Sequence, residues 1–172
     1  VAALGRAMLE GLSDQGVVGV VKHMPGHGRA TADSHVTLPC VTVDAAALDR
    51  DIAPFRALAD APMGMTAHVV YTAWDGERCA SLSPVVIGEV IRGTIGFDGL
   101  LMSDDLGMSA LAGSFGERAA GVLAAGCDIA LHCSGDMAEM SAVAAAVGVI
   151  TAAARARLDR AMASAQPAVR AG

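Results

Sequence analysis

The sequence contains no cluster of lysine and arginine; Lys22 is its only lysine, and its formal net charge is -6. Nucleic acids and anionic membranes attract positively charged surfaces, so neither is expected as a partner. No apolar run reaches the roughly 18 residues that cross a membrane. These absences favour a small neutral or polar molecule as the ligand.

Zinc-binding and disulfide patterns are also absent. The four cysteines form no CxxC pair, and four are too few for a dense disulfide framework in 172 residues. No secretory signal opens the chain. We therefore expect reduced and mostly buried thiols, no metal, no cofactor and a cytoplasmic location.

Short apolar segments alternate with segments of helical periodicity along the chain. The pattern predicts strands at residues 17–21, 63–70, 99–103 and 127–133. It predicts helices at residues 1–15, 45–60, 83–94, 109–125, 136–147 and 150–165. Such alternation is typical of an α/β fold with a parallel sheet, and four βα units are half of a TIM-type (β/α)8 barrel. We expect one domain over residues 1–165 and a frayed tail at 166–172.

Polar residues follow or end each predicted strand. Lys22 and His23 follow the first, which is expected to be buried on both faces, and His68, Asp104 and His132 belong to the ends of the next three. Ligands of parallel α/β sheets bind at the carboxyl ends of the strands. These side chains are therefore expected to converge on one face, although a lone lysine at a strand end can also be a surface charge without a task.

The stretch KHMPGHGRATADSHVTLP, residues 22–39, concentrates histidine, proline and charge in a chain that is otherwise rich in alanine and aliphatics. Asp33 and His35 are two positions apart, so an extended segment directs them to the same side. A carboxylate beside an imidazole fixes its tautomer and prepares it to donate and accept a proton. Alternatively, Asp33 caps a turn and His35 is structural. A metal site with His23 and His27 ranks third, because the spacing matches no zinc pattern.

The segment FDGLLMSDDLGM, residues 97–108, ends a predicted strand in two adjacent carboxylates. Neighbouring residues of a strand point to opposite faces, so only Asp104 or Asp105 can face a pocket squarely. The other carboxylate would support the turn or cap the next helix. A carboxylate at a strand end can act as a nucleophile or stabilise a cationic transition state, and the alternative is a simple helix cap.

Together these stretches resemble glycoside hydrolase family 3, and within it the NagZ-type β-N-acetylhexosaminidases. The resemblance rests on segments in the family's order, and it covers most of the chain: KHMPGHG at 22–28, DSH at 33–35, LP at 38–39, MTAHVVY at 65–71, GFDGLLMSDDLGM at 96–108 and AGCDIAL at 125–131.

The resemblance implies a TIM-like barrel that removes terminal β-linked N-acetylglucosamine from muropeptide-like fragments with retention of configuration. By this resemblance, Asp104 is the nucleophile that forms a covalent glycosyl-enzyme. His35 is the acid/base, with Asp33 as its partner in a dyad. Lys22 and His23 bind the sugar hydroxyls. The roles of Asp105 and His68 are not assigned by the pattern.

Members of the family carry an upstream barrel half, and no segment of this chain matches it. We therefore expect a complementing half, or self-association through open sheet edges, and weak or no activity of the 172 residues alone. Two alternatives remain at this point: a non-catalytic sugar-binding half-barrel, and a phosphorylase that transfers the sugar to phosphate.

Overall fold

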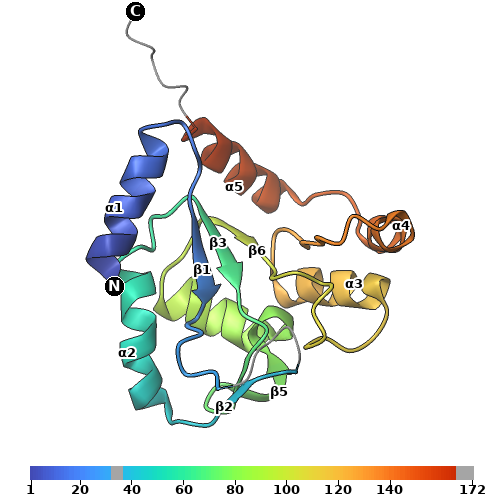
Figure 1. The fold of residues 1–172 in the computed structure, drawn as a ribbon, viewed down its shortest axis with the longest axis horizontal. Helices are drawn as coiled ribbons and strands as arrows, with labels where there is room; N and C mark the ends of the chain where they lie inside the picture. Colours follow the sequence, from blue (N-terminus) through green and yellow to red (C-terminus); the bar gives the residue numbers. More distant parts are fainter. Residues whose placement is uncertain (32–36, 166–172) are drawn as a thin grey trace, which may run out of the picture.

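The chain folds as alternating helices and strands, as predicted, in a computed structural model that describes residues 1–31 and 37–165 (Figure 1). The strands are β1 Val20–Met24, β2 Cys40–Val41, β3 Met63–Thr66, β4 Val70–Tyr71, β5 Asp75–Cys79 and β6 Leu100–Met102. The helices are α1 Ala2–Ser13, α2 Ala45–Arg56, η1 Ala80–Leu82, η2 Val86–Thr94, α3 Phe115–Ala125, α4 Met137–Ala146 and α5 Ala152–Ala163.

The main sheet is parallel, in the order β1-β3-β6. Val20 lies opposite Met63, and Met63 lies opposite Leu100. A single parallel bridge between Met102 and Ile129 continues the sheet by one more chain segment. The chain thus has the parallel α/β fold of a partial TIM-type barrel, with the strands in sequence order across the sheet.

The first strand begins and ends later than predicted. It was expected at residues 17–21, whereas β1 extends from Val20 to Met24. The reason is its ladder with β3, which continues to the last residue of β1, opposite Thr66. Lys22 and His23 therefore lie within the carboxyl-terminal half of the strand and not beyond it.

The expectation that this first strand is buried on both faces is wrong. Exposed and buried residues are mixed along it: Val20 is 37% exposed and Val21 only 8%, and Lys22 is exposed whereas Met24 is buried. β1 is the outer strand of the described sheet, and one of its edges has no strand beside it there. A run of branched apolar residues is typical of a strand covered on both faces, but in this structure Val20 of that run is exposed.

The predicted strand at 63–70 is two strands that belong to different sheets. After β3 the chain leaves the main sheet, and β4 pairs parallel with β2 and antiparallel with β5. The strand predicted at 127–133 is reduced to the bridge at Ile129. The second sheet was missed because β2 and β4 are two residues long, too short for a period of two to be recognised.

Most helices lie close to their predicted positions, but α3 begins at Phe115 and not at residue 109, because the Ser114 cap sets its start. Ser114 and Glu117 form a reciprocal capping box at the start of α3, and Gly126 ends that helix with φ 115°, a left-handed conformation that suits glycine. Asp136 caps α4 and Thr151 caps α5 through side-chain oxygens.

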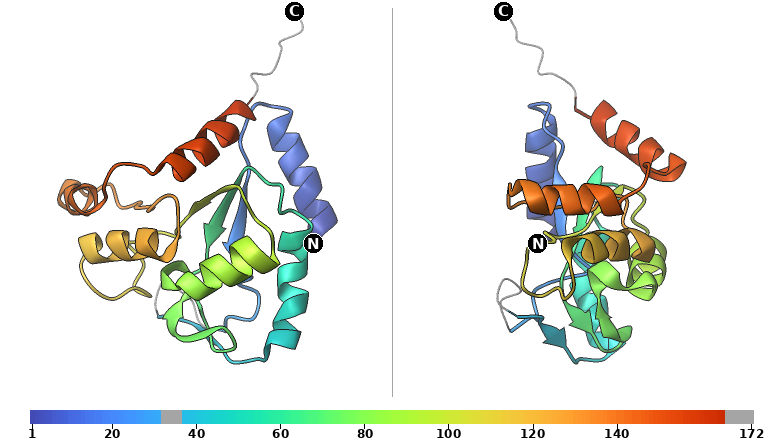
Figure 2. Two further views of the ribbon diagram at one scale, coloured as in Figure 1. Left: turned by 180° about the vertical axis from the view of Figure 1, so that it is seen from behind. Right: turned by 90° about the vertical axis from the view of Figure 1, so that its right-hand side faces the viewer.

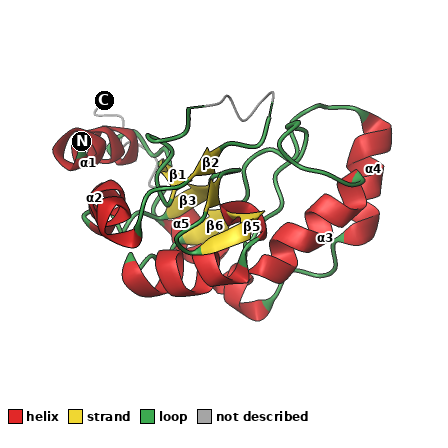
Figure 3. Ribbon diagram, turned by 90° about the horizontal axis from the view of Figure 1, so that it is seen from below, coloured by secondary structure: helices red, strands yellow, loops and turns green. Residues whose placement is uncertain are grey.

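Buried apolar side chains fill the space between the sheet and the helices α2, η2 and α3. The largest of them include Tyr71, Phe97, Met24, Leu48, Ile87, Ile91, Leu100, Leu101 and Leu106. Viewed from below, α1 and α2 lie on the left of the strands, α3 and α4 on the right and α5 behind them, and loops lie above the strands (Figure 3). In the described part of the chain, no helix has the length and apolar character needed to cross a bilayer.

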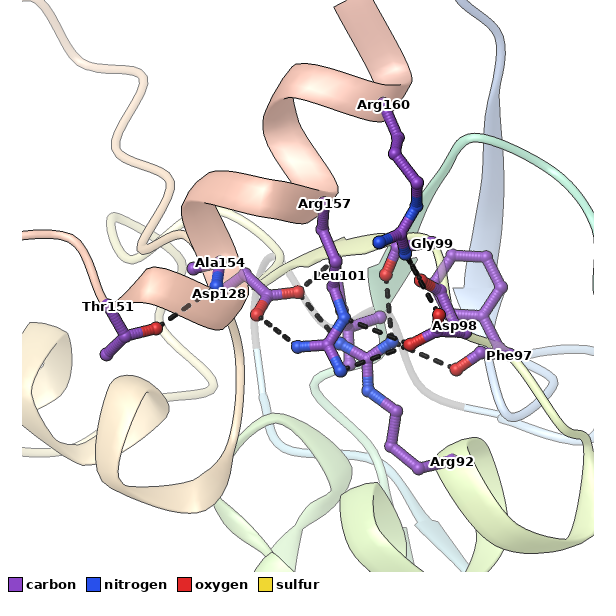
Figure 4. Close-up of polar contacts among 10 residues, drawn as sticks. All are labelled: Arg92, Phe97, Asp98, Gly99, Leu101, Asp128, Thr151, Ala154, Arg157 and Arg160. Carbon is purple, nitrogen blue, oxygen red and sulfur yellow. Dashed lines mark hydrogen bonds and ion pairs between the residues drawn. The ribbon is translucent and has the colours of Figure 1, made fainter.

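Ion pairs hold the amino-terminal end of β6 to α5 and η2 (Figure 4). Asp128, whose side chain is 6% exposed, pairs with Arg92 at 2.8 Å and with Arg157 at 3.0 Å. Asp98 pairs with Arg157 and Arg160 but is 74% exposed. Figure 2 shows α1 and α5 approaching each other at this same end of the sheet. Charged side chains at this end are therefore largely matched by partners of opposite sign.

Candidate active site

Polar side chains from neighbouring strands come together at the carboxyl ends of the main sheet, as predicted. His23 in β1 and Asp104, which follows β6, approach each other: Nε2 of His23 is 3.7 Å from Oδ2 of Asp104. The two side chains are 28% and 13% exposed. This separation is too long for a hydrogen bond. His23 and Asp104 are therefore neighbouring, partly buried polar side chains that are not hydrogen-bonded to each other.

Burial decides the charge of His23. It lowers the pKa of this imidazole, and the nearby Asp104 carboxylate opposes the shift without reversing it, while Lys22 and His27 add to it. His23 is therefore neutral at pH 7 and can accept or donate a hydrogen bond with either ring nitrogen. A neutral imidazole beside the Asp104 carboxyl group is suited to binding the hydroxyl groups of a neutral ligand.

His68, which follows β3, is buried and belongs to a chain of hydrogen bonds. Its Nε2 lies 3.0 Å from the carbonyl oxygen of Asp105, and since a carbonyl only accepts, Nε2 carries the proton. Nδ1 lies 2.8 Å from the Ser81 hydroxyl, which also donates to the Ala67 carbonyl at 3.1 Å and lies 2.6 Å from the Thr66 hydroxyl. Burial lowers the pKa of His68, which is consistent with this neutral tautomer.

The adjacent carboxylates have separate surroundings, as the alternation argument required. Asp104 faces His23, and its other oxygen accepts a hydrogen bond from the Asp105 amide at 2.9 Å. The Asp105 carboxylate accepts from the amides of Gly107 at 3.0 Å and Cys133 at 3.1 Å. Asp105 therefore supports the turn after β6, and Asp104 is the carboxylate presented beside β1.

Side chains from other elements contact the first residues after β1, within the described range that ends at residue 31. The buried Tyr71 hydroxyl donates to the carbonyl of Gly26 at 2.8 Å, and burial raises the pKa of this phenol so that it stays protonated. Arg29 pairs with Asp51 on α2. Gly26 has φ 139°, which a residue with a side chain rarely adopts. The proline and glycine residues of this segment thus form a fixed turn next to the candidate site.

A cavity of about 600 Å³ lies along the free edge of β1, between α1 and α2. Apolar side chains such as Leu9, Leu12 and Phe55 form its walls, and Lys22 and His23 line it too. Asp104 does not line this cavity. The cavity therefore extends away from the carboxylate, on the side where another strand of a parallel barrel would lie.

The predicted site residues have different outcomes. Lys22, His23 and Asp104 lie at the same end of the sheet, and the positive charge of Lys22 acts on the pKa values of His23 and Cys133. Asp33 and His35 lie outside the described residues, so their dyad stays a prediction. In the described ranges no three His, Cys, Asp or Glu side chains gather in a geometry that would hold a metal ion.

Sequence reasoning missed the partners of His68 and Asp105. Ser81 and Thr66 carried no visible signal, because single hydroxyl residues in apolar surroundings are common. The contact between Asp105 and Cys133 joins loops 28 positions apart, and no local pattern reports it. The only signal in the sequence was that Thr66 and Ser81 lie in the same βα unit as His68.

A parallel α/β sheet with histidines and a carboxylate at the carboxyl ends of adjacent strands is the arrangement of a TIM-barrel enzyme. Residues 1–165 match the Glycosyl hydrolase family 3 N terminal domain, and the chain belongs to that family.

The relatives are bacterial hexosaminidases. A β-hexosaminidase of Alkalilimnicola ehrlichii is 45% identical over 78% of this chain and 40% of its own length, and one of Chromobacterium violaceum is 44% identical over 78% and 39%. The crystal structure of NagZ from Neisseria gonorrhoeae in complex with N-trifluoroacetyl-D-glucosamine has a TM-score of 0.82 at 33% identity, covering 97% of this chain and 48% of that one. The chain thus spans about 40% of the length of these curated relatives.

Proposed function

We propose that this chain supplies the nucleophile-bearing half of a retaining exo-β-N-acetylglucosaminidase. Asp104 attacks the anomeric carbon and forms a covalent glycosyl-enzyme, which water then hydrolyses. His35, held by Asp33, protonates the leaving oxygen and later activates the water. Lys22 and His23 bind the sugar hydroxyls. The observation that carries this proposal is the separation of roles between Asp104, which faces His23, and Asp105, which is engaged by backbone amides.

The order of steps follows from the chemistry of the two groups. Protonation of the glycosidic oxygen by His35 lets the aglycone leave as a neutral alcohol while Asp104 forms the new bond. In the second step His35 removes a proton from water, which attacks the same carbon and releases Asp104 as a carboxylate. Each step inverts the configuration of the anomeric carbon, so the two steps together retain it. The products are the aglycone alcohol and the free sugar.

The relatives and the charge of the site support a proposal for the substrate class. The similar proteins are β-hexosaminidases, and one similar structure holds N-trifluoroacetyl-D-glucosamine. A neutral His23 beside Asp104 suits a neutral sugar better than an anionic one. We propose terminal β-linked N-acetylglucosamine of muropeptide fragments as the substrate and the cytoplasm as the location, where the four free cysteines would stay reduced.

A second barrel half is part of the proposal. The free edge of β1, the exposed Val20 side chain and the cavity between α1 and α2 lie on the side where the next parallel strand would pair. Leu4 and Met8 of α1 are 79% and 68% exposed, which adds apolar surface near the same edge. We propose that an upstream barrel half covers this surface and completes the sugar site.

The test compares the chain alone with the chain joined to the amino-terminal half of a β-hexosaminidase relative. Hydrolysis of 4-nitrophenyl β-N-acetylglucosaminide is expected for the joined protein and is weak or absent for the chain alone. Proton NMR of the first-formed sugar should show the β-anomer. Assays with and without phosphate separate a hydrolase, which releases free sugar, from a phosphorylase, which releases sugar 1-phosphate. A joined protein that folds and binds N-acetylglucosamine but cleaves nothing would make the non-catalytic alternative correct.

A further inference from the structure

His68 is a buried polar residue that the proposed reaction does not use. It is 0% exposed and follows β3 at the carboxyl end of the main sheet. Its Nε2 lies 3.0 Å from the carbonyl oxygen of Asp105, the residue directly after the proposed nucleophile Asp104. Its Nδ1 lies 2.8 Å from the Ser81 hydroxyl. The ring therefore contacts the turn after β6 from the side of the neighbouring strand.

The direction of the hydrogen bond between His68 and Asp105 does not depend on the charge of the ring. A carbonyl oxygen only accepts, so Nε2 must carry a proton to bind it. Nε2 carries that proton both in a neutral ring with this tautomer and in a doubly protonated ring. The separation of 3.0 Å is the normal length of such a bond. His68 is therefore the donor to Asp105 in either charge state.

The amide, the carbonyl and the carboxylate of Asp105 each have a hydrogen-bond partner. The carbonyl also accepts from the Met108 amide at 3.2 Å, and the carboxylate accepts from the Gly107 and Cys133 amides. The Asp105 amide donates to Oδ1 of Asp104 at 2.9 Å. This last bond holds one oxygen of the proposed nucleophile. The orientation of Asp105 therefore sets the direction of the Asp104 carboxylate.

His68 extends the connection between β3 and β6 beyond the end of their ladder. That ladder ends at Met102, before the turn. On the opposite side of the turn, backbone bonds continue further, since the Leu106 amide donates to the Leu131 carbonyl at 2.8 Å. On the β3 side, the His68 side chain makes the bond to the turn that the backbone ladder does not reach.

The same part of the chain is also joined to the strand that carries His23. The amide of Ala67, directly before His68, donates to the carbonyl of Met24 at the end of β1, at 2.8 Å. His68 therefore connects the end of β1 with the turn after β6. These are the two elements that place His23 and Asp104 3.7 Å apart.

We propose that His68 is a positioning residue whose Nε2–H, bound to the Asp105 carbonyl, holds the turn after β6 so that the Asp104 carboxylate faces His23. The consequence for catalysis rests on the proposed role of Asp104 as the nucleophile. Without this donor a buried carbonyl has one partner fewer, and the turn loses its side-chain bond to the β3 side. A displacement of about 1 Å at a reacting atom can slow a reaction on the order of a hundredfold.

Two substitutions separate the donor from the ring that carries it. The side-chain amide nitrogen of glutamine can take the place of Nε2, so His68→Gln keeps a donor for the Asp105 carbonyl. Asparagine reaches only to the position of Nδ1, so His68→Asn keeps a polar group beside Ser81 and loses the donor. Both variants remove the imidazole, so a difference between them reports the bond to Asp105.

The first test uses no enzymatic activity, so it stays informative if the proposed function is wrong. Nitrogen-15 NMR of the full chain, labelled at histidine, should show a protonated Nε2 on His68, assigned by the signals that His68→Gln loses. Amide hydrogen exchange then compares the variants. The Gly107 and Cys133 amides should exchange roughly tenfold to a hundredfold faster in His68→Asn than in His68→Gln, whereas the amides of α5 should exchange alike in both.

Three results of this first test would overturn the proposal. They are an unprotonated Nε2 on His68, equal exchange of the Gly107 and Cys133 amides in the two variants, and a rise in His68→Asn that is as large in α5 as in the turn. Should His68→Asn fail to fold, His68→Gln is compared with the unsubstituted chain. The turn amides should then keep rates close to those of the unsubstituted chain, and faster exchange of the turn at unchanged α5 rates would refute the role of the donor.

The second test uses the joined barrel described above with phenyl β-N-acetylglucosaminide, whose poor leaving group makes formation of the glycosyl-enzyme the slow step. His68→Asn should lower kcat by roughly tenfold to a hundredfold with little change in KM, because the nucleophile is misplaced and binding is not. His68→Gln should keep most of the activity. Equal loss of kcat in both variants, or a loss expressed only in KM, would contradict the positioning role. A joined barrel that is inactive in every form, with the expected exchange rates, would refute the proposed function and leave the role of His68 in the turn intact.

Discussion

Replacing Asp128 with asparagine tests how the amino-terminal end of the sheet is held. The Asp128 carboxylate accepts from Arg92 at 2.8 Å, from the Leu101 amide at 2.9 Å and from Arg157 at 3.0 Å. Burial is the main cause of the lowered pKa of Arg92, and the Asp128 charge is what opposes it. Asp128→Asn keeps the shape of the side chain and removes that charge (Figure 4).

The size of the effect follows from burial. Removing one partner of a buried ion pair costs about 3–5 kcal/mol, because the other charge is left uncompensated. Arg92 would keep the carbonyls of Phe97 and Gly99, at 2.9 Å and 2.8 Å, so the lower end applies. We expect a loss of about 3 kcal/mol of unfolding free energy, which for a chain of this length lowers Tm by roughly 6–12 °C.

Asp98→Asn is the matched control. It removes the same charge from the same network, but Asp98 is 74% exposed, and exposed pairs contribute roughly 0–1 kcal/mol. Urea unfolding of both variants, followed by circular dichroism and by the fluorescence of Trp74, the chain's single tryptophan, measures the two losses. Equal losses in Asp128→Asn and Asp98→Asn, at unchanged m-values, would refute the argument from burial.

The remaining predictions concern the carboxyl end of the sheet. Asp104→Ala should abolish turnover of the joined barrel, and normal turnover in that variant would disprove the nucleophile assignment. His35→Ala should slow cleavage most for substrates with poor leaving groups, as a series of aryl glycosides measures. Burial lowers the pKa of His68 in the folded chain below its usual value near 6.5. The unfolded chain therefore binds more protons than the folded chain as pH drops from 7 to 5, so the free energy of unfolding should fall over this range. His68→Gln should flatten this dependence in urea titrations, and an unchanged slope would show that other groups cause it. Tyr71→Phe removes the bond to Gly26 and should cost about 1 kcal/mol in the same titrations, whereas no loss would mean that this bond does not hold the loop.

The sequence predicted the limits of the helices better than those of the strands. The helices carry end signals within three or four residues: Asp136 at α4 coincides with the predicted start, whereas the capping box of Ser114 and Glu117 starts α3 later than the predicted residue 109. Strand limits depend on the neighbouring strand. β1 reaches Met24 only because β3 pairs with it that far, and β2 and β4 exist only through their mutual pairing. Such pairing joins distant segments, so no single window of sequence contains it.

The same division applies to the site. The convergence of His23, His68 and Asp104 was predictable, because parallel topology alone brings strand ends to one edge. Alternation alone did not choose between Asp104 and Asp105, since it states that they diverge but not which one faces inward; only the family resemblance named Asp104. The amides of Gly107 and Cys133 make that choice, and Cys133 arrives from a different βα unit.

The two ends of the sheet also differ in how their charges are satisfied. At the amino end, each oxygen of Asp128 accepts from an arginine, and the network fastens α5 and η2 to the sheet. At the carboxyl end, the Asp104 oxygen that faces His23 lies 3.7 Å from Nε2 of that ring, beyond hydrogen-bond distance. A buried charge paired at short distance stabilises the fold, whereas a carboxylate held apart from the neighbouring imidazole leaves room for a ligand hydroxyl or an electrophilic carbon. The stability of this chain and its proposed chemistry thus depend on opposite ends of the same strands, so Asp128→Asn should weaken folding without altering the contacts of Asp104.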